Sequence, residues 1–128
     1  MLDMNDPQMA GWNLALRFGL EFAALAGFAV AAWYFSSGPM RWVAVTAVPL
    51  FVAIIWGAFN VRDDPSRSGK APIEVGGRVR LAIELLVLVG GALAFALAGR
   101  IPVSVGLSVL IFAHYATSVS RIKWLIRA

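Results

Sequence analysis

Two pairs of charged residues interrupt apolar stretches of the sequence. Arg17 and Glu21 stand four positions apart, and Arg80 and Glu84 repeat the same pair with the same spacing. Residues at i and i+4 share one face of a helix, so each pair can join a guanidinium to a carboxylate. A carboxylate inside a membrane needs such a partner or takes up a proton. Three interpretations therefore stay open: a structural ion pair, a proton- or ion-linked site, or a site at which a partner docks.

A polar stripe near the C-terminus supplies further candidates. His114, Thr117, Ser118 and Arg121 fall at i, i+3, i+4 and i+7, which is one face of a helix. Asn60 ends an earlier apolar run. We expect most of these side chains to gather at one membrane depth. The predicted intramembrane polar cluster comprises Arg17, Glu21, Asn60, Arg80, Glu84, His114, Thr117 and Ser118.

Enzyme and metal chemistry find little support in the sequence. The chain has no cysteine and one histidine, which excludes thiolate sites and histidine-rich sites. It contains no zinc-protease helix motif, no phosphate-binding loop and no nucleophile–base motif. We therefore expect a non-catalytic protein with no metal and no cofactor.

The elements that must position these residues are strongly apolar. Hydrophobic residues make up 60% of the 128 residues, charged residues make up 14%, and the mean hydropathy is +0.78. A soluble domain is about half apolar and about a quarter charged. The composition predicts a single-domain integral membrane protein with the lipid bilayer around it. The basic residues flank apolar runs, so membrane topology explains the high pI better than nucleic-acid binding does.

Four apolar runs each approach the ~20 residues that cross a bilayer as a helix. Backbone N–H and C=O groups cannot remain without hydrogen bonds in lipid, so only helices and closed barrels cross a membrane. The runs do not alternate like barrel strands, and we therefore predict an all-α fold with four transmembrane helices. The short turns "SSGPM" and "GRIP" join the helices into two hairpins. The expected helices cover residues 13–35, 41–60, 79–98 and 102–120. The expected organisation is an interfacial or disordered segment (1–12), a first hairpin (13–60), a cytoplasmic loop (61–78), a second hairpin (79–120) and a basic cytoplasmic tail (121–128).

The distribution of basic residues predicts the orientation. Nine of the eleven Lys and Arg residues would lie on the side that holds both termini and the middle loop. Because cytoplasmic loops carry the excess of Lys and Arg, both termini are predicted to be cytoplasmic. Arg41 and Arg100 would lie on the other side.

The two hairpins look like copies of each other. Shifting the chain by 63 residues superimposes four pairs of residues without a gap: Arg17 on Arg80, Glu21 on Glu84, Gly27 on Gly90, and Pro39 on Pro102. Each unit crosses the membrane twice, so the copies would form a parallel repeat about an axis along the membrane normal. Chance alignment of apolar segments is the alternative.

Small residues recur on the first and third predicted helices. Gly27 and Ala31 stand four apart, as do Gly90 and Ala94. Such spacing lets two helix backbones approach closely. We expect these residues to pack helices within the bundle, with a face between copies of the chain as the alternative.

Three segments of the chain resemble a known family. "NLALRFGLEFAALAGF", "VPLFVAIIWGAFNV" and "VRLAIELLVLVGGALAFALAG" are similar to the YrdB-like family, also called DUF2568, over about residues 13–120. Its pattern falls on both Arg–Glu pairs and, in the second helix, on Pro49, Trp56 and Gly57. His114 departs from a position that is often Asn-like in the family. The resemblance implies a small four-helix protein of the bacterial inner membrane and supplies no activity, substrate or cofactor.

Two functions follow as hypotheses. The first is a small scaffold or accessory subunit that binds another membrane protein or a second copy of itself. The second is an oligomeric transporter or channel, linked to protons or ions through Glu21 and Glu84.

Overall fold

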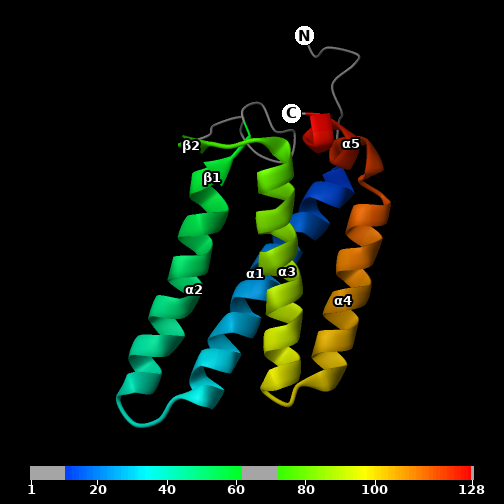
Figure 1. Ribbon diagram of the computed structural model, residues 1–128. Helices are drawn as coiled ribbons and strands as arrows, with labels where there is room; N and C mark the ends of the chain where they lie inside the picture. Colours follow the sequence, from blue (N-terminus) through cyan, green and yellow to red (C-terminus); the bar gives the residue numbers. More distant parts are fainter. Residues whose placement is uncertain (1–10, 62–71, 128) are drawn as a thin grey trace.

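The described part of the chain is a bundle of helices (Figure 1). The computed structural model describes residues 11–61 and 72–127. The expectations for residues 1–10 and 62–71 lie outside the described residues, as does residue 128. The helices are α1 (Gly11–Phe35), α2 (Met40–Ala58), α3 (Gly77–Leu97), α4 (Ile101–Ala116) and α5 (Val119–Arg127), and two short strands, β1 (Phe59–Asn60) and β2 (Ile73–Glu74), pair in parallel.

Several of these helices are long and apolar enough to cross a membrane. Three qualify individually, namely α1, α2 and α3, and the number rises to four if α4 and α5 form one bent span. Helix α4 has 16 residues, which is shorter than the ~20 residues that cross the hydrocarbon layer. The fold is therefore that of an all-α protein with three to four candidate membrane spans.

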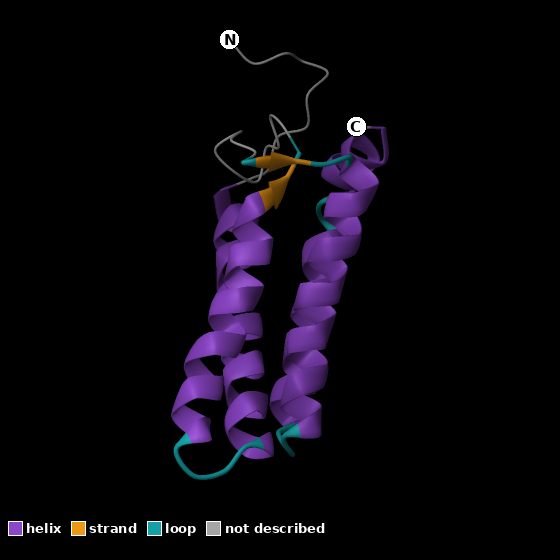
Figure 2. Ribbon diagram, turned by 60° about the vertical axis from the view of Figure 1, so that its left-hand side comes forward, coloured by secondary structure: helices purple, strands orange, loops and turns teal. Residues whose placement is uncertain are grey.

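Helices α1 and α3 form the centre of the bundle. In Figure 1, helix α1 crosses behind α3. It packs against both α2 and α3, while α3 also contacts α4 and α5. Figure 2 shows the same bundle turned by 60°, with the two strands at one end of the helices. Helix α2 packs mainly on α1 and touches α3 little. The buried apolar side chains therefore lie mostly between α1 and α3, with Leu20 and Leu88 wholly enclosed.

Glycines set the distance between α1 and α3. A Cβ on Gly27 would collide with the carbonyl oxygen of Gly91 and the ring of Phe95. A Cβ on Gly91 would collide with the backbone of Ala24. The two backbones are thus in direct contact, which glycine permits and any larger residue prevents.

The other three predicted packing residues lie around this crossing. Gly90 faces only the end of the Phe28 ring, 3.0 Å from where a Cβ would lie. Ala94 is buried and Ala31 is half-buried. The close approach therefore involves Gly91, which the repeat alignment did not select, more directly than its neighbour Gly90.

Helix α2 ends two residues earlier than expected because its last carbonyls find other donors. The side-chain amide of Asn60 donates to the carbonyl of Gly57 at 2.6 Å. Arg80 Nη1 donates to the carbonyls of Trp56 (2.6 Å) and Phe59 (2.9 Å). Carbonyls at a helix C-terminus lack partners within the helix, and a cation there is favourable. Residues 59–60 then leave the helix and pair with β2.

The fourth expected helix is broken. The hydroxyls of Thr117 and Ser118 bond back to the carbonyls of Ala113 (2.8 Å) and His114 (2.7 Å). Such bonds compete with the helical ladder. After the break the chain turns by 70° into α5, which carries residues 119–127, including most of the expected tail, across the end of the bundle.

Candidate functional site

A single carboxylate, that of Glu84, collects three arginines. Its Oε1 accepts from Arg17 Nη2 at 2.6 Å, from Arg80 Nε at 3.0 Å and from Arg121 Nη2 at 2.7 Å. Its Oε2 accepts from Arg121 Nη1 at 3.0 Å and from the Tyr115 hydroxyl at 3.0 Å. We call these five residues the Glu84 network.

The Glu84 network joins four helices at one end of the bundle. Arg17 comes from α1, Arg80 and Glu84 from α3, Tyr115 from α4 and Arg121 from α5. The side chains of Glu84 and its three arginines are at most 2% exposed. Hydrogen bonds between charged groups are among the strongest in proteins, and burial strengthens them further. The arrangement therefore fixes these helices relative to one another.

Helix α2 is tied to the same network through Trp56. The guanidinium carbon of Arg80 lies 4.6 Å from the Trp56 ring centroid, and that of Arg17 lies 5.0 Å from it. Both distances are within the range of cation–π attraction. Arg80 also donates to carbonyls at the end of α2. Together these contacts attach α2 to the Glu84 network, which then involves all five described helices.

A second polar contact joins the start of α1 to the end of α4. Asn13 donates to the Thr117 hydroxyl at 2.8 Å and accepts from the Ser118 hydroxyl at 3.1 Å. Asn13 stands one turn before Arg17 on α1. This i, i+4 spacing is the signal in the sequence that places it on the same face.

His114 is wholly buried beside the network. Its ring packs edge-on against Tyr115, with 4.9 Å between ring centroids. Within residues 11–61 and 72–127, neither ring nitrogen has a hydrogen-bond partner. His114 thus contributes its carbonyl, which accepts from Thr117 and Ser118, and its packing.

Glu21, which the predicted repeat aligns with Glu84, lies in different surroundings. It is half-buried and lines a groove of about 270 Å³ between α1 and α2. Phe18, Phe22 and Trp56 line the same groove. The structure therefore places one carboxylate at the centre of the network and the other at a groove beside Trp56.

The eight predicted site residues therefore do not form one cluster. Arg17, Arg80 and Glu84 form the centre of the Glu84 network, and His114 packs beside it. Thr117 and Ser118 form the contact with Asn13, Glu21 lines the groove, and Asn60 bonds to the end of α2. The residues that the predicted set omits are Asn13, Trp56, Tyr115 and Arg121. Arg121 belongs to the polar stripe by spacing, but nothing in the sequence shows that α5 folds back. Among the described residues, no group of three or more His, Asp or Glu side chains could hold a metal ion.

Comparison with known proteins identifies the family. Residues 15–112 match the family described as "Protein of unknown function (DUF2568)". The chain belongs to the DUF2568 family. The resemblance found in the sequence is confirmed by this match. Arg17, Glu21, Arg80 and Glu84 lie inside the matched range of DUF2568, whereas Tyr115 and Arg121 lie beyond it.

A relative within DUF2568 covers nearly the whole chain. The chain is 44% identical over 114 residues to "Uncharacterized protein YrdB" of Bacillus subtilis (strain 168), which is 89% of this chain and 93% of the relative. No solved structure matches the chain. Neither description names an activity.

Proposed function

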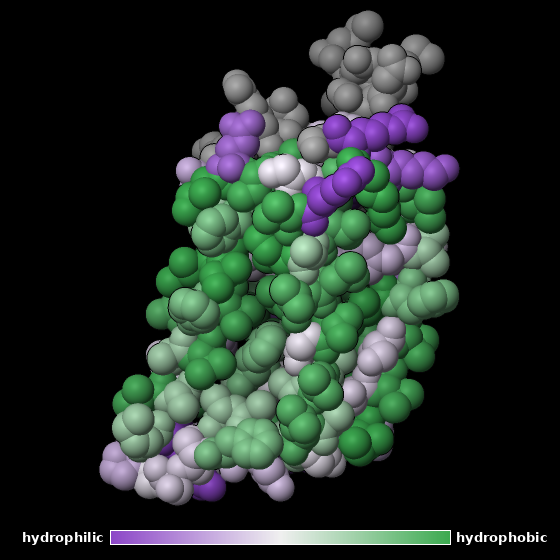
Figure 3. Space-filling model, viewed as in Figure 1, coloured by the Kyte–Doolittle hydropathy of each residue, from purple (hydrophilic) through white to green (hydrophobic). Residues whose placement is uncertain are grey.

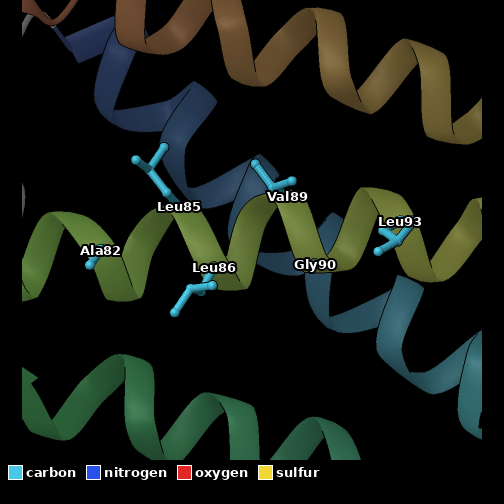
Figure 4. Close-up of a pocket in the computed structure, with 6 residues that line it drawn as sticks. All are labelled: Ala82, Leu85, Leu86, Val89, Gly90 and Leu93. Carbon is cyan, nitrogen blue, oxygen red and sulfur yellow. The ribbon is translucent and has the colours of Figure 1, made fainter.

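We propose that this DUF2568 protein is a non-catalytic scaffold or accessory subunit of the bacterial inner membrane, which binds a helix of another membrane protein or of a second copy. The supporting observation is an apolar hollow of about 550 Å³ on the outer face of α3. Its lining is wholly aliphatic: Ala82, Leu85, Leu86, Val89, Gly90 and Leu93. In Figure 4, Leu86 lies on the side of α2, and Leu85 and Val89 lie on the side of α4.

The Glu84 network supports this proposal because it gives the hollow a rigid frame. Because the Glu84 carboxylate accepts from three guanidiniums and a hydroxyl, we infer that its role is to stabilise the bundle. Helix α2 is held at its end by Arg80 and Trp56 but packs little on α3 along its length. The surface of α3 next to α2 is therefore open to another apolar helix, and small residues such as Gly90 and Ala82 allow a close approach.

The proposed topology completes this picture. We propose that α4, continued by the start of α5, is a fourth span, and that the two hairpins form a parallel repeat. The end of the bundle with the Glu84 network would face the cytoplasm, as the excess of Lys and Arg on that side favours. The relative from Bacillus subtilis and the apolar helices support a bacterial membrane location for this arrangement.

Single cysteines test the scaffold proposal, because the natural chain has none. Leu86→Cys places a thiol in the hollow, and Phe112→Cys places one on α4, where Phe112 is 78% exposed. Tyr115 contacts Glu84, and positions 86 and 112 each lie within one turn of that contact. The two thiols would therefore lie at similar depths. A benzophenone attached to each thiol in native membranes should give a protein adduct from position 86 and not from position 112.

The adduct must be reproducible to support a partner. Mass spectrometry should identify the same single protein, or this chain itself, in independent preparations. The same protein should co-purify with the unmodified chain in mild detergent. Adducts only to lipid at both positions, or the same mixture of proteins at both, contradict the proposal.

A second candidate function rests on Glu21. Its groove between α1 and α2 places a carboxylate beside aromatic rings, which is compatible with an oligomeric transporter or channel linked to protons or ions. In proteoliposomes, Glu21→Gln should then abolish proton or ion flux, while Glu74→Gln, which changes an exposed carboxylate on β2, should not. Flux that is absent, or unchanged by Glu21→Gln, removes this function.

A further inference from the structure

Helix α5 lies against the start of α3 and exposes its opposite face. Arg121 and Leu125 are buried against the bundle. A Cβ on Gly77, the first residue of α3, would collide with the Leu125 carbonyl, so the two backbones touch. With the 70° turn after α4, this contact holds α5 across the end of the bundle.

The outer face of this region is basic. Lys123 and Arg127 stand one turn apart on α5, and both are exposed. Arg78 follows the contact glycine on α3 and is also exposed. Glu74 on β2 is the one exposed acidic residue among residues 11–61 and 72–127. We give the name α5 basic face to Lys123 and Arg127 of α5 together with Arg78 of α3.

Apolar side chains adjoin the α5 basic face. Val79, next to Arg78 in the sequence, is 52% exposed, and Ile126, next to Arg127, is 45% exposed. Trp124 on α5 is half-buried. Figure 3 shows hydrophilic side chains gathered at the end of the molecule where α5 lies, directly above a hydrophobic flank. Any molecule that covers this surface must therefore present negative charge next to an apolar region.

Phospholipids have this combination. A basic amphipathic helix at the end of an apolar bundle lies at the level of the headgroups. Lys and Arg there attract anionic headgroups, and the guanidinium fork suits phosphate oxygens. We propose that the α5 basic face binds the phosphodiester headgroups of anionic phospholipids. A soluble polyanion or a nucleic acid would leave Val79 and Ile126 in water, whereas a phospholipid covers them with its glycerol and acyl chains.

Native mass spectrometry of the full chain tests this proposal. The protein is purified in mild detergent with equal amounts of phosphatidylglycerol and phosphatidylcholine that carry the same acyl chains. The wild-type chain should retain phosphatidylglycerol in preference. Lys123→Gln, Arg127→Gln and Arg78→Gln should each lower that preference by about fivefold, because each basic residue near an anionic surface contributes about that factor.

Matched variants separate a specific surface from general charge attraction. Arg100→Gln removes one exposed cation at the opposite end of the bundle and should leave the preference unchanged. Arg127→Lys should retain it. Arg121 and Leu125 are untouched in all variants, so helix content and melting temperature should match those of the wild type. Measuring both checks that each variant is folded.

Three results would overturn the proposal. One is a wild-type chain that retains both lipids equally. Another is a loss for Arg100→Gln as large as that for Lys123→Gln. The third is displacement of the lipid by soluble glycerol phosphate at the same concentration, which would show that the surface binds a free phosphate group.

Discussion

Arg17 on α1 donates to Glu84 on α3 at 2.6 Å, across 67 positions of the sequence, although Glu21 stands one turn away on its own helix. Arg80, which the proposed repeat aligns with Arg17, donates to the same Oε1 from within α3. Guanidiniums from α1 and α3 therefore share one carboxylate, which α3 supplies. Glu84 is wholly buried, whereas Glu21 is half-buried. We expect the two carboxylates to contribute differently to stability.

The first prediction compares the two carboxylates. Glu84→Gln removes the acceptor that three buried guanidiniums share, and breaking a buried ion pair in this way costs about 3–5 kcal/mol. Glu21→Gln changes a half-buried residue at a groove and should cost clearly less. Unfolding in a denaturing detergent, followed by circular dichroism, measures both free energies. Equal losses would mean that the Glu84 network does not hold the bundle together.

The second prediction uses two adjacent glycines on α3. Gly91→Ala places a methyl group against the backbone of Ala24, so α1 must move, at a cost of about 1–3 kcal/mol. Gly90→Ala meets only the end of the Phe28 ring, which can rotate away. Because alanine favours a helix by about 1 kcal/mol, Gly90→Ala should be neutral or stabilising. The melting temperatures of the two variants test this, and the reverse order would show that α1 crosses α3 elsewhere.

The third prediction concerns the contact between α5 and the start of α3. Gly77→Ala should push α5 off α3, because a Cβ there collides with the Leu125 carbonyl. Gly76→Ala is a matched control, since open space surrounds that position and its backbone is extended. Hydrogen exchange of the amides in 119–127 should accelerate in Gly77→Ala alone. Equal protection in both variants would contradict the contact between α5 and the start of α3.

The fourth prediction addresses His114. Within the described chain its ring nitrogens have no hydrogen-bond partner, and a buried polar group in that position costs about 1–3 kcal/mol. His114→Leu replaces the ring by an apolar side chain of similar volume and should raise the melting temperature. A lower melting temperature would reveal a partner for the imidazole, and His114→Gln would then restore part of the stability.

Much of the architecture follows from local properties of the sequence. The apolar runs and the short Gly- and Pro-containing turns predicted α1, α2 and α3 to within a few residues, because helix formation in apolar segments depends mainly on neighbouring residues. The Arg80–Glu84 contact was predictable for the same reason, since i, i+4 spacing brings side chains together on one helix. The quoted segments also sufficed to predict the DUF2568 family.

Other features depend on how helices meet. Spacing along one helix says nothing about the rotation and crossing of its neighbours. It therefore predicted Glu21 as the partner of Arg17, whereas the packing of α1 on α3 pairs Arg17 with Glu84. The break after α4 turns α5 back and brings Arg121 to Glu84, a contact that follows from two hydroxyls bonding to the backbone and from the absence of a Cβ on Gly77.

The sequence alone determined that this chain is an apolar helical protein with a few charged residues inside its apolar helices, because hydropathy and helical spacing are local quantities. The tertiary structure decided which of those charges meet. The close approach at Gly27 and Gly91 sets the rotation of α1 on α3, and that rotation turns Arg17 toward Glu84. Glu84 therefore lies at the centre of the Glu84 network, and Glu21 lines the groove between α1 and α2.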